Sequence, residues 1–207
     1  MYLTKLVLDL RSSQARRDLS DAYEMHRTLA RAFVFDDKTK PSRFLWRQDV
    51  AGNNWATPTL LIQSMAAANW MTIRDLPSYL KQEPQTKEFD FSELIERDRR
   101  YRFRLAANPT VTKNGKRIGI GGEENQIAWL GRQGERHGFH LEHALVTDSG
   151  ILSSSRKRDV PSITIGRVSY EGVLRAMQTT ALIDAAVGGI GPAKAFGCGL
   201  LSLARLS

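Results

Sequence analysis

The residues best suited to chemistry lie in one short stretch near the N-terminus, from Tyr23 to Arg31. In a helix, residues three and four apart share a face, so Tyr23, His26 and Arg27 would lie on or beside one stripe. Arg31 would follow one turn later. Such a group could cleave RNA without a metal ion, because one side chain can activate a ribose hydroxyl, another can protonate the leaving oxygen, and the cations can stabilise the phosphorane. Histidine suits either proton-transfer role because its unperturbed pKa is about 6.5.

The same spacing has a plainer interpretation. A histidine and a tyrosine on a basic helix face are more often solvated or structural than catalytic. Met25, Leu29 and Phe33 point roughly the opposite way and are spaced to face a core. The helix by itself therefore leaves both interpretations open.

A glycine-rich run from Gly188 to Gly199 is the second unusual feature. Glycine permits positive φ and a close approach of the backbone to a ligand, so this run and its Lys194 could contact phosphate. It is not a nucleotide-triphosphate loop, because no serine or threonine follows the lysine and the preceding element is predicted to be a helix rather than a strand. Nucleotide hydrolysis is therefore not favoured.

The composition favours a polyanionic partner. The 207 residues include 30 Lys and Arg against 22 Asp and Glu, a formal charge of +8, which suits nucleic acid or anionic lipid. Two basic clusters are either solubilising loop tips or grips on an RNA backbone or groove. They are Lys113, Lys116 and Arg117 in one loop, and Arg156, Lys157 and Arg158 in a turn between predicted strands.

Three histidines, His137, His140 and His143, recur at every third position. In a strand this spacing sends alternate members to opposite faces, and neither a cysteine nor a pair of carboxylates joins them. The single Cys198 rules out an intramolecular disulfide and a cysteine-based zinc site. We therefore expect no metal ion and no cofactor.

The chain shows no sign of a membrane or export segment. No apolar run approaches the ~18–20 residues that cross a bilayer, and the N-terminus lacks the order of a signal peptide. We expect a cytoplasmic protein.

Hydrophobic periodicity predicts an α+β fold made of two tandem ferredoxin-like domains with a C-terminal glycine-rich loop. The domains are predicted at residues 1–92 and 93–207. The first begins strand, helix, strand, strand, and the second shows the full strand-helix-strand-strand-helix-strand order. In the first domain the predicted elements are strands at 2–9, 43–49 and 59–66, a helix that is capped by Ser20 or Asp21 and runs to about Phe35, and a Gly52-Asn53-Asn54 turn. A connector at 69–98 with a short strand at 87–91 follows. In the second domain they are a strand at 101–107, a polar loop at 110–122, a helix at 123–134, strands at 139–146, 151–155 and 163–174, a helix at 178–187, and a strand at 200–203.

Six segments spread over nearly the whole chain carry a more specific signal. They are 1–5, 23–29, 103–109, 126–130, 170–174 and 189–202, the last being the most specific. Together they resemble the CasE family, the CRISPR repeat-processing endoribonucleases of the type I-E Cascade surveillance complex. The order of the six matches makes coincidence improbable.

The resemblance implies tandem ferredoxin-like domains and cleavage of precursor CRISPR RNA at the base of a repeat stem-loop. It implies metal-free attack by the 2′-hydroxyl, which leaves a 2′,3′-cyclic phosphate and a 5′-hydroxyl. It also implies a protein that is a monomer when free, acts in near single turnover, stays on the 3′ hairpin of its product, and joins the other Cascade subunits.

The family's site residues fall on specific positions of this chain. The catalytic histidine falls on His26, the assisting tyrosine on Tyr23, and the basic helper on Arg31, where a lysine also occurs in the family. Arginine keeps the charge but is better suited to clamping phosphate than to giving up a proton. The residues implied in RNA binding are Arg27, Lys113, Lys116, Arg117, Arg156, Lys157, Arg158, Gly191 and Lys194, with 156–158 in a hairpin that enters the major groove of the stem.

Two other functions stay open on the sequence. One is a non-catalytic subunit of the same complex that binds the RNA hairpin. The other is a small-molecule nucleotide-binding protein that uses the glycine-rich run, although the lack of a Walker-type lysine argues against it.

Overall fold

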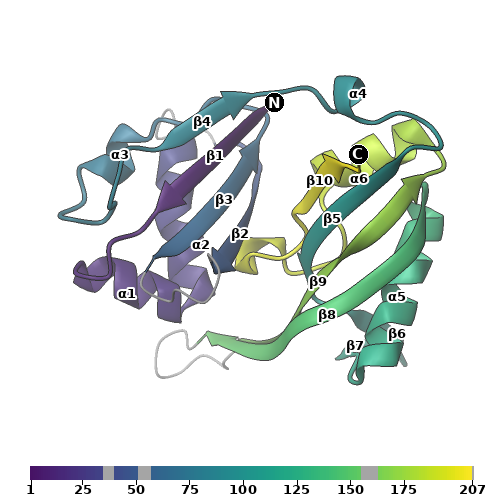
Figure 1. Ribbon diagram of the computed structural model, residues 1–207. Helices are drawn as coiled ribbons and strands as arrows, with labels where there is room; N and C mark the ends of the chain where they lie inside the picture. The colour runs from purple at the N-terminus through teal and green to yellow at the C-terminus, as the bar shows by residue number, and fades with distance from the viewer. Residues whose placement is uncertain (35–39, 51–56, 155–162, 207) are drawn as a thin grey trace. The chain divides into compact units, whose positions relative to one another are not determined.

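The computed structural model describes residues 1–34, 40–50, 57–154 and 163–206. The chain forms two compact units (Figure 1). Unit 1 contains residues 1–89 together with 195–197, and unit 2 contains residues 90–194 and 198–207. Each unit is built on a four-stranded antiparallel sheet.

The strand order in unit 1 is β2-β3-β1-β4, with helices between β1 and β2 and between β3 and β4. Two interleaved β-α-β connections give this order, which is the ferredoxin-like arrangement. The predicted fold class is therefore confirmed for this unit. Its elements are β1 (Tyr2–Val7), α1 (Ser13–Ser20), α2 (Ala22–Ala30), the 3₁₀ helix η1 (Arg31–Phe33), β2 (Phe44–Val50), β3 (Pro58–Ser64), α3 (Met71–Arg74) and β4 (Gln85–Glu88).

The core of unit 1 lies between the sheet and α2. Leu6 of β1 and Ile62 of β3 are buried together with Met25 and Leu29 of α2. Met25 and Leu29 are four residues apart and so share one helix face, as their spacing indicates. This packing determines which face of α2 is left for chemistry.

The prediction that Ser20 or Asp21 caps a helix is confirmed, because Asp21 is the N-cap of α2, but the predicted continuation of that helix to about Phe35 is wrong, and the helix before it was not predicted. A separate helix, α1, ends at Ser20, and Asp21 then serves both as the C-cap of α1 and as the N-cap of α2. At its other end α2 stops at Ala30, and the chain continues as η1. Helix α1 is short and mostly polar, so its sequence carries little periodic signal.

Unit 2 has the corresponding order β10-β5-β9-β8, which is again ferredoxin-like. In β5 the buried Tyr101, Phe103 and Leu105 alternate with the exposed Arg102 and Arg104, as expected for a strand with one covered face. Its elements are α4 (Phe91–Leu94), β5 (Arg100–Ala107), β6 (Thr110–Lys113), β7 (Lys116–Gly119), α5 (Glu123–Arg136), β8 (Phe139–Ser154), β9 (Ile163–Ala176), α6 (Thr179–Gly188), η2 (Lys194–Phe196) and β10 (Leu201–Arg205).

Three predictions in the irregular regions are corrected. The predicted loop at 110–122 contains the hairpin β6-β7, in which Lys113 pairs with Lys116. The two strands predicted at 139–146 and 151–155 are one strand, β8, which bends at two bulges instead of breaking. The connector at 69–98 includes two short helices, and its strand, β4, begins at Gln85. The predicted Gly52-Asn53-Asn54 turn lies outside the described residues.

Candidate active site

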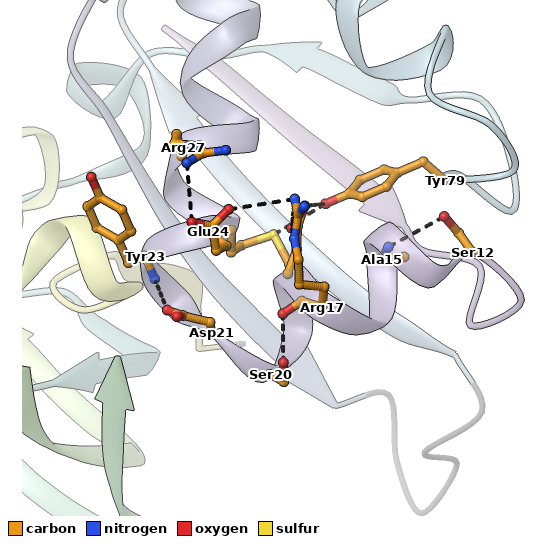
Figure 2. A network of polar contacts seen from close by, with 11 residues as sticks. Ser12, Ala15, Arg17, Ser20, Asp21, Tyr23, Glu24, Arg27 and Tyr79 are labelled. Carbon is orange, nitrogen blue, oxygen red and sulfur yellow. Dashed lines mark hydrogen bonds and ion pairs between the residues drawn. The ribbon is translucent and has the colours of Figure 1, made fainter. Parts of the chain in front are cut away.

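Helix α2 carries the residues predicted to do chemistry, and Asp21 determines where it begins. The Asp21 carboxylate accepts a hydrogen bond from the backbone N–H of Tyr23 at 2.9 Å (Figure 2). This satisfies one of the N–H groups that have no partner within the helix. Tyr23 is thereby placed in the first turn and His26 one turn later.

The imidazole of His26 packs on an aromatic ring from the sheet. Its ring stacks on Phe44 of β2, with centroids 4.9 Å apart and planes 20° apart. Burial lowers the pKa of His26 below its ordinary value of about 6.5. The residue is only partly exposed, and its buried Nδ1 atom has no hydrogen-bond partner within the described part of the chain. His26 therefore favours the neutral form near pH 7.

Arg27 and Arg31, the two cations predicted beside His26, are both exposed but lie on different elements. Arg27 is exposed and forms an ion pair with Glu24 at 3.3 Å, while the other oxygen of Glu24 lies 3.6 Å from Arg17. Figure 2 shows these three side chains together, with the Tyr23 phenol extending away from Arg17. Arg31 is also exposed, at the start of η1 instead of within the α-helix. Arg27 and Arg31 are thus both open to solvent.

A buried carboxylate holds α1 and α2 to the rest of unit 1. The Asp18 side chain is fully buried and accepts hydrogen bonds from Arg17 at 2.8 Å and from the Tyr79 hydroxyl at 2.8 Å. The same hydroxyl lies 3.7 Å from the sulfur of Met25 in α2. Burial and the neighbouring Asp18 both raise the pKa of Tyr79, so its hydroxyl remains a donor. Through the Tyr79 hydroxyl, this network joins Asp18 of α1 to Met25 of α2.

Tyr79→Phe is expected to reduce the free energy of unfolding by about 1–3 kcal/mol, because a buried carboxylate oxygen loses a donor. Denaturant unfolding of the variant measures this. Tyr2→Phe is the matched control, since Tyr2 is only partly buried, and it should stay within about 0.5 kcal/mol of the parent. Equal stability of all three proteins would contradict a structural role for the Asp18 network.

The glycine-rich run follows α6 and is held by close packing. Gly191 and Gly197 both have positive φ. A Cβ at Gly191 would lie 3.2 Å from the Trp129 ring, and one at Gly197 would lie 3.1 Å from the Trp46 ring. At these two positions a side chain would require the indole to shift by a few tenths of an ångström and would also adopt an unfavourable positive φ. Lys194 is partly buried at the start of η2, and residues 195–197 group with unit 1.

The three histidines spaced by three do not form one cluster of ligands. His137 is the C-cap of α5, not part of a strand. His140 and His143 are exposed on β8 and pair with Arg175 and Val173, which are two apart on β9. They therefore share a face, so the alternation argument was wrong for this pair, because a bulge between Leu141 and His143 adds a residue. Within the described ranges, no three His, Cys, Asp or Glu side chains are grouped to hold a metal ion.

The basic residues of the predicted loop at 110–122 lie on the β6-β7 ribbon. Every residue from Val111 to Gly119 is exposed. Lys113 and Lys116 face each other across the ribbon, and Arg117 pairs with Thr112. The second predicted cluster, Arg156, Lys157 and Arg158, lies outside the described residues.

Sequence reasoning missed Phe44, the residue against which His26 packs. Phe44 begins a strand that was correctly located, but nothing in its local sequence indicates which helix residue covers it. Asp18 was also missed, because a carboxylate in a short polar helix is expected to be solvated.

No helix in the described part of the chain is long and apolar enough to span a membrane.

Comparison with known proteins links this arrangement to one family. A family model described as CRISPR associated protein matches residues 1–205. The chain is 33% identical over 216 residues to CRISPR-associated endoribonuclease Cse3 of Thermus thermophilus, covering 99% of this chain and 100% of that protein. It is 41% identical over 118 residues to the CRISPR system Cascade subunit CasE of Escherichia coli, covering 50% and 57% of the two chains. A structure of the CRISPR endoribonuclease Cse3 bound to 19-nucleotide RNA superposes with a TM-score of 0.88 at 32% identity, over 99% of this chain and 100% of that one.

Proposed function

The chain belongs to the family of CRISPR-associated proteins that includes Cse3 and CasE, and we propose from this that it is the endoribonuclease that processes precursor CRISPR RNA. It cuts at the base of the repeat stem-loop without a metal ion. One observation carries the chemistry: His26, the position that corresponds to the family's catalytic histidine, is held on Phe44 with its pKa lowered by burial.

The proposed reaction is a transesterification within the RNA backbone. Neutral His26 accepts the proton of the 2′-hydroxyl, the 2′-oxygen bonds to the adjacent phosphorus, and the bond from phosphorus to the 5′-oxygen breaks. Tyr23 assists by giving a proton to the departing 5′-oxygen. The products are a 2′,3′-cyclic phosphate and a 5′-hydroxyl, and atoms and charges balance without water or metal.

The cations stabilise the charge that develops on the phosphorane. Arg31 and Arg27 are exposed on the same part of unit 1, and guanidinium groups bind two phosphate oxygens at once. To bind the phosphate, Arg27 must release the Glu24 carboxylate, so that one anionic partner replaces another. We assign phosphate clamping, not proton transfer, to Arg31.

We assign the remaining RNA contacts to unit 2. After cleavage the protein stays on the 3′ hairpin of its product as part of Cascade. This takes place in the cytoplasm. The relative called Cascade subunit CasE supports the assembly, and the relative solved with 19-nucleotide RNA supports RNA binding. A protein that keeps its product acts in near single turnover. The residues we assign to these contacts are Lys113, Lys116, Arg117, Arg156, Lys157, Arg158, Gly191 and Lys194.

The end chemistry of a cut repeat RNA tests the proposal. The purified protein is incubated with a labelled repeat hairpin in excess EDTA, and the fragments are treated with phosphatase and with acid. Cleavage in EDTA that leaves a phosphatase-resistant, acid-opened 3′ end supports the mechanism. Cleavage lost on chelation contradicts it, and tight binding of an RNA that stays intact indicates the non-catalytic subunit instead.

Removal of the basic side chains should alter both affinity and its dependence on salt. Each neutralised phosphate contributes about 0.7–0.9 to the slope of log K against log salt, so Arg156→Ala with Arg158→Ala should reduce the slope by ~1–2. Lys113→Ala with Lys116→Ala tests the ribbon in the same way. Filter binding at several salt concentrations measures the slope. An unchanged slope would show that the substituted pair does not contact the backbone.

A further inference from the structure

Phe44 is the centre of a group of aromatic rings beneath His26. It stacks with Phe33 of η1 at 4.5 Å and 11° as well as with His26, and the edge of Trp70 meets Phe33 at 5.8 Å. Phe44 is 7% exposed and Phe33 is 1% exposed. The surface that His26 rests on is therefore part of the core and cannot easily rotate.

The histidine lacks the usual means of orientation. A catalytic imidazole is commonly aligned by a hydrogen bond from its second ring nitrogen to a carboxylate or carbonyl. In the described part of unit 1, the Nδ1 atom of His26 has no such partner. Among the described residues, Phe44 is the one aromatic side chain whose ring contacts this imidazole.

We propose that Phe44 is a positioning residue for RNA cleavage: its ring, in place of a hydrogen-bonded carboxylate, holds the His26 imidazole in the plane from which it acts. This inference rests on the proposed function, because it assigns a purpose to the orientation of His26. Phe44 touches no RNA in this scheme and acts only through His26.

Burial lowers the pKa of His26, and Phe44 is one of the residues that bury it. The ionisable side chains near His26 in sequence are Tyr23, Glu24, Arg27 and Arg31, and Arg43 precedes Phe44. None of these is a cause of the shift, which comes from burial alone. The segment 195–197, which groups with unit 1, carries no ionisable side chain.

Loss of the Phe44 ring should change the pKa of His26 in a direction that follows from its burial. Removing the ring hydrates the imidazole, so the pKa of His26 rises towards about 6.5. Because the neutral imidazole is the proposed base, the acid limb of the rate profile moves to higher pH. Misplacement of the reacting group adds a loss of rate at every pH, and a shift of about 1 Å can cost ~100-fold.

The test uses Phe44→Ala, Phe44→Leu as a milder variant that retains an apolar core, and Phe44→Tyr as the variant that keeps the ring. Single-turnover cleavage of the repeat hairpin is measured from pH 5 to pH 9, and the Cε1–H signals of the histidines are titrated by NMR. The chain has 4 histidines, so single substitutions assign every signal. His137, whose pKa is lowered by burial in unit 2, is the internal reference.

The expected result is a loss of at least ~10-fold in cleavage rate for the leucine variant, with recovery in the tyrosine variant and unchanged hairpin affinity. The His26 titration should move to higher pH in Phe44→Ala, while His137 does not move. Unchanged His26 titration and unchanged rates in both the alanine and leucine variants would overturn the inference. If the parent protein fails to cut RNA, the proposed function fails, and the NMR titration still decides whether Phe44 buries the His26 imidazole.

Discussion

His26→Ala is expected to reduce cleavage of the repeat hairpin by ~100-fold to 10,000-fold, the range over which a positioned acid or base contributes to catalysis. Hairpin affinity should change little, because the imidazole packs on Phe44 and carries little positive charge near pH 7. Single-turnover cleavage in EDTA and a direct binding measurement separate the two effects. The change should appear in the rate of the chemical step.

His140→Ala is the matched control for this variant. It also removes an imidazole, but from an exposed position on β8 of unit 2. Its cleavage rate should equal that of the parent protein. A His26→Ala protein that still cuts at the parental rate would remove His26 from the mechanism, and one that loses both cutting and binding would indicate a structural histidine.

Gly172→Ala should produce the largest change in stability. Gly172 lies in β9 opposite Ala144, between the two bulges of β8, and a Cβ there would overlap the backbone carbonyl of His143 and lie 2.9 Å from the Cα of Ala144. The obstruction is backbone, which cannot rotate away as a side chain could. We expect the free energy of unfolding of unit 2 to decrease by ~3 kcal/mol or more, at the upper end of what overpacking costs.

Gly166→Ala is the control, because Gly166 is on the same strand and a Cβ there would have no atom within 4 Å. Its stability should remain within about 1 kcal/mol of the parent. Both substitutions replace glycine by alanine in the same strand, so the change in strand propensity is the same and the difference between the variants reports the steric overlap. Thermal and denaturant unfolding compare the two variants. Similar stabilities would mean that β8 and β9 can shift at the bulge at little cost.

The sequence alone determined most of the elements and the position of the proposed chemistry. The first residues of β5 alternate between buried and exposed, and the spacing of Met25 and Leu29 indicates the buried face of α2, because both patterns depend on residues close together in the chain. The face that remains holds Tyr23, His26 and Arg27. Local spacing was therefore enough to group these residues, while their catalytic roles came from the resemblance to the CasE family.

Only the tertiary structure decided how those residues are held. The hydroxyl of Tyr79, 61 positions further on, donates to the buried Asp18, and His26 stacks on Phe44 from a strand that follows the helix. The bulge that places His140 and His143 on one face exists only in the pairing of β8 with β9. These features are contacts between distant segments, and the types of the residues involved do not reveal them until packing brings the segments together.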